Sequence, residues 1–329
     1  MIKGIKKIVC IGGGTGTFTV LSGLKKYNNL SLAAIVTMAD DGGSSGILRD
    51  ELGVLPPGDV RQCLVALSSE DQILRQLFNY RFGIGPFIGH NFGNIFMASL
   101  EKITGSFKEA VESAGRLLNI KGEVIPVTLE KTKLGIQLDS GKKIIGENKI
   151  NKFPSLSEFP DKRIFLQPVV KANPKAIAAI KKADVIIMGP GNIFCSIIPN
   201  LVVGGIAEAI KKSKAVKIYN CNLMTKKGHT DNFKVEDFIE VIEQYLGKGT
   251  LDYVTFNIRK PSNIFLKKYS QEGEFVGFNK KSLLNKKFKG ENLISNKITK
   301  LDPADVLIKR TLIRHDSDKL AKLIIKLCK

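Results

Sequence analysis

Residues 7–46 read KIVCIGGGTGTFTVLSGLKKYNNLSLAAIVTMADDGGSSG, and they contain the clearest indication of the fold class. A short apolar run, Lys7–Ile11, leads straight into glycines, and apolar residues then recur at helical spacing over 18–24. A second apolar run, Ala33–Met38, ends in another glycine-rich segment. Strand, loop, helix and strand within roughly thirty residues form the pattern of a βαβ unit.

The same alternation continues in the second half of the chain. Asp184–Met188, Ala215–Cys221 and Leu251–Asn257 are strand-like runs separated by helical patterns, which is typical of a parallel sheet. Segments within 120–160 have the pattern of short strands joined by hairpins. We therefore expect an α/β fold with a Rossmann-like, mostly parallel sheet and helices on both faces. We expect one domain over 1–329, with a small antiparallel, β-rich insertion at 120–160.

The composition restricts the class of protein. Lys and Arg number 51 against 31 Asp and Glu, which gives a net charge of +20. The lysines are spread along the chain with little aromatic interleaving, so we expect attraction of an anionic small ligand and no binding of nucleic acid. No run of about 18 apolar residues is present, so we expect no membrane insertion. Five scattered cysteines without a CxxC pair indicate a reducing, cytoplasmic location.

The first glycine loop has the composition of a phosphate-binding loop. It consists of Gly12, Gly13, Gly14, Thr15 and Gly16, between a strand and a helix. Backbone N–H groups there can surround a phosphate at the positive end of the helix dipole. The spacing G-x-G-x-G differs from the dinucleotide fingerprint G-x-G-x-x-G. The alternative is a tight turn that binds nothing.

Two adjacent carboxylates follow the second strand. The loop there consists of Asp40, Asp41, Gly42, Gly43, Ser44 and Ser45. Adjacent acids repel each other and are tolerated best near a metal, a helix N-terminus or a hydroxyl-rich ligand. The serines add small hydroxyl donors beside a flexible backbone. The segment predicts a ligand-binding loop, and the alternative is a solvated turn.

A third glycine loop repeats the pattern. Gly189, Pro190, Gly191 and Asn192 follow the strand Asp184–Met188. In open α/β sheets, ligands bind outside the carboxyl ends of the strands. We therefore expect the three loops to converge on one cleft.

Single polar residues outside the loops are further candidates. Asp59 is placed to cap the helix expected over Val60–Ser68. His90, between Gly89 and Asn91, could donate a proton or bind a phosphate, or serve a structural role. His229 has no partner in sequence and is expected on the surface.

A series of motifs carries a resemblance to a known family. In chain order they are IGGGTG at 11–16, ADDGGSSG at 39–46, LRDELG at 48–53, LPPGD at 55–59, Gly89-His90 with Gly93-Asn94, GPG at 189–191, SIIPNL at 196–201, NLMT at 222–225 and RHD at 314–316. With them the chain resembles, over nearly its whole length, the YvcK-type gluconeogenesis factors of the CofD-like family. Within these motifs Asp59, Asn94, Ser196 and Asn222 join the predicted ligand-binding residues.

The resemblance implies a function. It implies a cytoplasmic, Rossmann-like regulatory protein that binds UDP-sugars such as UDP-N-acetylglucosamine and is needed for cell shape and growth on gluconeogenic carbon. CofD itself transfers a phospholactyl-type group from a nucleotide-diphosphate donor to a deazaflavin with magnesium. Magnesium is therefore a candidate cofactor here, and a CofD-like transferase is the alternative function. A second alternative is an interaction scaffold with a vestigial site. Cell-wall or metabolic regulatory proteins and a second copy of the chain are candidate partners.

Two segments depart from the family pattern. At 189–196 the chain reads GPGNIFCS where the family has GPGSLYTS, so Asn192 replaces a hydroxyl and Cys195 a threonine. At 226–230 it reads KKGHT in place of Q-x-G-E-T. These departures leave the identity of the ligand open.

Two residues of the far C-terminal half complete the predicted site. Arg314 lies at an element boundary, and its guanidinium can bind two phosphate oxygens at once. Tyr269 precedes a polar turn and offers a ring to a uracil or a hydroxyl to a ribose. A surface ion pair for Arg314 and a half-buried core position for Tyr269 are the alternatives. Asp316 is expected to cap the last helix.

Overall fold

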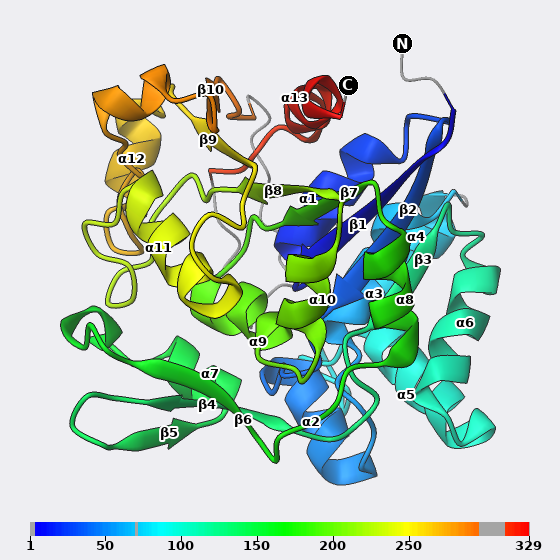
Figure 1. Ribbon diagram of the computed structural model, residues 1–329. Coiled ribbons are helices and arrows are strands. Elements are labelled where there is room, and N and C mark those ends of the chain that lie inside the picture. Colours follow the sequence, from blue (N-terminus) through cyan, green and yellow to red (C-terminus); the bar gives the residue numbers. More distant parts are fainter. Residues whose placement is uncertain (1–3, 70–71, 296–312, 329) are drawn as a thin grey trace.

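The computed structural model describes residues 4–69, 72–295 and 313–328. Its core is a seven-stranded sheet in which every neighbouring pair is parallel (Figure 1). In spatial order the strands are β10 (Phe288–Glu291), β9 (Tyr253–Asn257), β8 (Val216–Asn220), β7 (Val185–Met188), β1 (Lys6–Gly12), β2 (Leu30–Val36) and β3 (Glu123–Pro126). The predicted mostly parallel α/β sheet is confirmed.

The strand order reverses between β1 and β7. From β1 the chain moves outward to β2 and β3, whereas β7 to β10 run outward on the other side. Right-handed crossovers in opposite directions place the helices of the two halves on opposite faces. Helix α1 packs with α3 and α13, and α10 packs with α8 and α11 (Figure 1). At such a reversal the loops after the two central strands diverge and leave a crevice.

The helices connect and cover these strands. The described α-helices are α1 (Thr15–Leu24), α2 (Gly43–Leu52), α3 (Gly58–Leu67), α4 (Gln72–Asn79), α5 (Phe92–Thr104), α6 (Phe107–Leu117), α7 (Glu147–Asn151), α8 (Pro174–Lys182), α9 (Ile198–Leu201), α10 (Ile206–Lys212), α11 (Val235–Leu246), α12 (Asn263–Tyr269) and α13 (Ser317–Leu327). Helical turns of the 3-10 or π type are η1 (Leu156–Glu158), η2 (Ile193–Ile197) and η3 (Lys280–Leu284). None of the described helices is long and apolar enough to cross a membrane.

Two helices are capped by the residues that the sequence predicts. The Asn173 side chain accepts the Lys175 N–H at 3.0 Å, with Pro174 in the first turn of α8. Asp316 accepts the N–H groups of Asp318 and Lys319, both at 3.0 Å, and so caps α13 as predicted. Such caps satisfy donors that a helix cannot satisfy itself.

The antiparallel insertion begins later in the chain than expected. Strands β4 (Lys133–Gln137), β5 (Lys143–Ile145) and β6 (Arg163–Gln167) form it, in the order β5-β4-β6. Strand β3 lies within the expected range of 120–160 but pairs in parallel with β2 at the edge of the main sheet. The physical reason is burial, because Val124 and Ile125 pack into the main core.

Candidate functional site

A cavity of about 590 Å³ opens beside the point where the strand order reverses. Its walls come from the loops that follow β1, β7 and β8, with contributions from the end of α12 and from residues 313–315. This volume is in the range of pockets that hold small organic ligands.

The cavity gathers predicted residues from both ends of the chain. Those that line it are Thr15, Gly16, Gly191, Asn192, Asn222, Tyr269 and Arg314. The first and third glycine loops therefore converge, but the expected convergence of all three loops on one cleft is wrong, because no residue of the loop 40–46 lines this cavity. Tyr269 is only 6% exposed and packs with Leu223 and Met224, so it is a core residue and a cavity wall at once.

The N-terminus of α1 forms one end of the cavity. Thr15, Gly16 and Thr19 line it, and no side chain in the described part of the chain caps the first turn of this helix. N–H groups at a helix N-terminus favour an anion. A Cβ atom on Gly16 would lie 1.8 Å from the carbonyl oxygen of Pro190, so glycine is what allows the first and third loops to touch.

Two asparagines hold the third loop in place. The Gly191 N–H donates to Asn222 Oδ1 at 3.0 Å, and Asn222 Nδ2 donates to the Gly191 oxygen at 2.9 Å. Asn192 Oδ1 accepts the N–H groups of Phe194 and Cys195 at 3.1 and 3.3 Å. Both side chains thus fix the backbone of the cavity wall.

The remaining predicted residues lie beside the cavity, behind the first loop. Gly13 lies between Asp59 and Ser196, because a Cβ atom on it would lie 2.9 Å from both Asp59 Oδ2 and Ser196 Oγ. Gly14 is equally enclosed, since its Cβ would lie 2.6 Å from Asp59 Oδ1. On the other side, Asn200 Nδ2 donates to the Gly12 oxygen at 3.2 Å. The first loop is therefore held by side chains from α3 and α9.

The second predicted loop belongs to this neighbouring region and does not line the cavity. Ser44 Oγ lies 3.3 Å from His90 Nδ1, and Asn94 Nδ2 donates to Ser45 Oγ at 3.4 Å. Gly43 opens α2 with φ +47, a left-handed conformation that favours glycine. His90 and Asn94 thus position the loop after β2.

Three half-buried carboxyl groups lie close together behind the loop. Burial raises the pKa of Asp40, while hydrogen bonds from the Gly42 N–H and from Ser45 oppose the rise. Burial, together with the charges of Asp40 and Glu147, raises the pKa of Asp59 well above its usual range. Burial and the Asp40 charge likewise raise the pKa of Glu147 to about 7. Buried like charges favour protonation of some members of the group.

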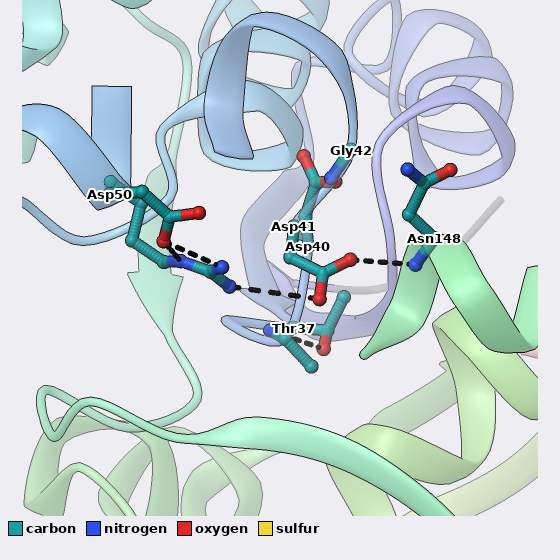
Figure 2. Close-up of polar contacts among 8 residues, drawn as sticks. Thr37, Asp40, Asp41, Gly42, Asp50 and Asn148 are labelled. Atoms are coloured by element: carbon teal, nitrogen blue, oxygen red, sulfur yellow. Dashed lines mark hydrogen bonds and ion pairs between the residues drawn. The ribbon is translucent and has the colours of Figure 1, made fainter. Parts of the chain in front are cut away.

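Asp41 is tied to the insertion and to α2. Its Oδ1 accepts the Asn148 N–H at 2.6 Å, and its Oδ2 lies 3.9 Å from Arg49 Nη1 (Figure 2). Arg49 also binds Asp50, with Nη2 and Oδ1 2.9 Å apart. The two adjacent aspartates therefore have different roles. Asp40 interacts with Asp59 and Glu147, whereas Asp41 connects α7 of the insertion to α2.

Two predictions about single residues are wrong. Asp59 does not cap a helix, because α3 already begins at Gly58 and Asp59 accepts a hydrogen bond from the backbone of Gly14 in the first loop. His229 is not on the surface but 1% exposed, and burial lowers its pKa to about 4. In both cases a contact distant in sequence overrides the local pattern.

Three further polar residues of this region, Glu147, Asn151 and Lys226, belong to none of the predicted binding residues. Lys226 lines the cavity and donates from Nζ to the Asn151 oxygen at 2.6 Å and also to the Asn151 side chain. Glu147 hydrogen-bonds the Cys195 thiol. Glu147 and Asn151 stand on α7, inside the insertion, and no motif marks them. Only the departure at 226–230 signals Lys226.

The described residues do not form a resident metal site. Among them, no group of three or more His, Cys, Asp or Glu side chains is arranged to hold a metal ion. Magnesium commonly binds through one or two carboxylates together with phosphates of the substrate. The residues present therefore fit magnesium only as a companion of a bound phosphate ligand, and its involvement stays a prediction.

Replacing Glu147 with glutamine should change how stability depends on pH. The pKa of Glu147 is raised from 4.5 to about 7 in the folded state. A raised pKa means that the parent protein loses stability as pH rises through this window, because the folded state binds the proton more tightly. The Gln variant lacks this loss, so relative to the parent it should gain up to about 3 kcal/mol between pH 4 and 8.

Urea unfolding at several pH values measures this difference. Glu240→Gln is the matched control, because Glu240 is exposed on α11 and should leave the pH dependence of the parent unchanged. Parallel pH profiles for Glu147→Gln and the parent would show that Glu147 does not hold its proton in the folded state.

Comparison with known proteins places this geometry among relatives. A family model described as 2-phospho-L-lactate transferase CofD matches residues 8–290. A relative from Thermotoga maritima is 43% identical, over 97% of this chain and 98% of its own length. The gluconeogenesis factor of Bacillus subtilis is 37% identical over 98% of both chains. A solved structure of a UPF0052 family member from Bacillus halodurans has a TM-score of 0.87 at 36% identity, covering 99% of this chain and 100% of the other.

Proposed function

This chain belongs to the CofD family and, within it, to the gluconeogenesis factors, and from that premise we propose that it is a regulatory protein that binds a UDP-sugar. The proposed ligand is UDP-N-acetylglucosamine, and the proposed role is in cell shape and growth on gluconeogenic carbon.

One observation carries the proposal. The N-terminus of α1, Arg314 and Tyr269 all line one cavity. These are the groups that a nucleotide diphosphate requires: N–H donors and a guanidinium for the phosphates, and a ring for the base. The net charge of +20 supports the proposal further, because it attracts a doubly charged diphosphate.

A second candidate is a CofD-like transferase. It is supported by the family model over residues 8–290 and by the half-buried carboxyls of Asp40 and Asp59 behind the first loop. Under this proposal the same cavity holds a nucleotide-diphosphate donor. Release of a nucleoside monophosphate on addition of a deazaflavin acceptor would favour the transferase.

Calorimetric titration of the purified protein tests the leading proposal. We expect UDP-N-acetylglucosamine to bind and NAD to bind much more weakly, because the first loop lacks the dinucleotide spacing. Ligand at a hundredfold excess over Kd should also raise the free energy of unfolding by about 2.7 kcal/mol. NAD binding tighter than every UDP-sugar would overturn the proposal. Regulatory protein partners and self-association belong to the same proposal and are tested by pull-down with and without the ligand.

A further inference from the structure

His315 lines the cavity and carries a buried ring nitrogen that has no partner among the described residues. It lies directly after Arg314, forms an antiparallel bridge with Ile294, and is 9% exposed. The residue lines the cavity, yet its Nε2 has no hydrogen-bond partner within residues 4–69, 72–295 and 313–328. A buried polar atom without a partner is unfavourable, so a partner supplied by a ligand would be favoured.

The backbone of Cys221 decides the tautomer of this ring. The ring shares a hydrogen bond with the Cys221 backbone that favours its protonated form. The Cys221 N–H already donates to the Thr255 oxygen at 2.9 Å, so the ring donates to the Cys221 carbonyl. Because Nε2 is unpartnered, the donor is Nδ1. Burial lowers the pKa of His315 to about 4, so the ring is neutral at pH 7 and Nε2 carries a lone pair.

The surroundings of His315 suit a flat base. Leu223, Met224, Tyr269 and Ile313 form one buried apolar cluster, and all four also line the cavity. Apolar walls with a small number of placed polar groups are the usual construction of a ligand subsite. This end of the cavity therefore combines an aromatic ring, aliphatic side chains and one hydrogen-bond acceptor.

We propose that His315 Nε2 accepts a hydrogen bond from the ring N–H of the bound nucleobase and thereby selects its chemical class. Uracil offers such an N–H at N3. Cytosine carries a lone pair at the same position, which would face the lone pair of Nε2. The inference rests on the proposed function, because it assigns the base-recognition residue of that same cavity.

The first test changes the ligand and leaves the protein untouched. UDP, CDP, the diphosphate of 3-methyluridine and 2′-deoxy-UDP are titrated into the full-length protein by calorimetry. We expect UDP to bind at least about tenfold more tightly than CDP and than the methylated ligand, which both lack the donor. The 2′-deoxy ligand should bind within about twofold of UDP.

The second test changes the protein. In His315→Phe the ring volume stays but the acceptor is lost, so the preference for UDP over CDP should fall from about tenfold towards none. His315→Asn serves if the Phe variant does not fold, because its amide can still donate to Cys221 and nothing replaces Nε2. The matched control is His229→Phe, which removes another buried imidazole outside the cavity wall and should keep the preference.

The outcomes separate the two proposals. If no uridine nucleotide binds the parent protein, the proposed function fails. If UDP binds but CDP and the methylated ligand bind equally well, only the assignment of His315 fails. A loss with 2′-deoxy-UDP that disappears in the His315 variants would assign Nε2 to the ribose and overturn the base assignment.

Discussion

Gly16→Ala should destabilise the protein by about 3 kcal/mol or more, the largest loss of stability expected from a single methyl group in this site. The added Cβ would lie 1.8 Å from the Pro190 oxygen and 2.6 Å from its carbonyl carbon, and backbone atoms cannot turn aside as a side chain can. Replacing a helical glycine with alanine normally stabilises a helix by up to about 1 kcal/mol. Helix propensity alone would therefore predict that Gly16→Ala stabilises the protein, whereas the close contact with Pro190 predicts that it destabilises the protein.

Urea unfolding of the variant and the parent measures this effect, and Gly191→Ala is the matched control. A Cβ on Gly191 would meet only side-chain atoms, at 3.3 Å from Ile197 and 3.4 Å from Ser196. The control lies in the loop that Gly16 touches and should cost less than about 1 kcal/mol. A Gly16→Ala protein as stable as the control would show that the two loops do not make this close approach.

Arg314→Lys should weaken binding of the UDP-sugar by about one to two decades in Kd. Arg314 lines the cavity that the α1 N-terminus also lines, so its guanidinium can bind two phosphate oxygens with parallel hydrogen bonds. The lysine ammonium keeps the charge but cannot form the two parallel hydrogen bonds of the guanidinium. A charge-assisted hydrogen bond contributes about 1.5–3 kcal/mol. The loss should appear in the affinity of the folded protein for the ligand.

Calorimetry with the same UDP-sugar measures this loss. Arg259→Lys is the matched control, because Arg259 is exposed after β9, outside the cavity wall, and should bind as the parent does. Parental affinity in a folded Arg314→Lys protein would remove Arg314 from the phosphate site. Binding would then depend on the helix N-terminus and the glycine loops alone.

The sequence predicted the candidate site most accurately where the site is formed by backbone groups of glycine loops and of a helix N-terminus. Glycine at Gly16 and Gly191 and the helix start at Thr15 could be placed from sequence, because a strand, a glycine loop and a helix are read from neighbouring residues. The same local reasoning failed for Asp59, which looked like a helix cap but lies under the first loop. It also failed for His229, whose burial comes from residues far away in the chain.

Residue patterns were enough to predict the α/β alternation, the three glycine loops at strand ends, and the family to which the chain belongs. Each of these depends on the order and spacing of residues within a few turns of chain. The assembled fold was needed to show that Glu147 joins Asp40 and Asp59, that Asn222 holds Gly191, and that His315 lines the cavity with a buried, unpartnered nitrogen among the described residues. These roles depend on burial and on partners distant in sequence, and both arise only when the strands are assembled into one sheet.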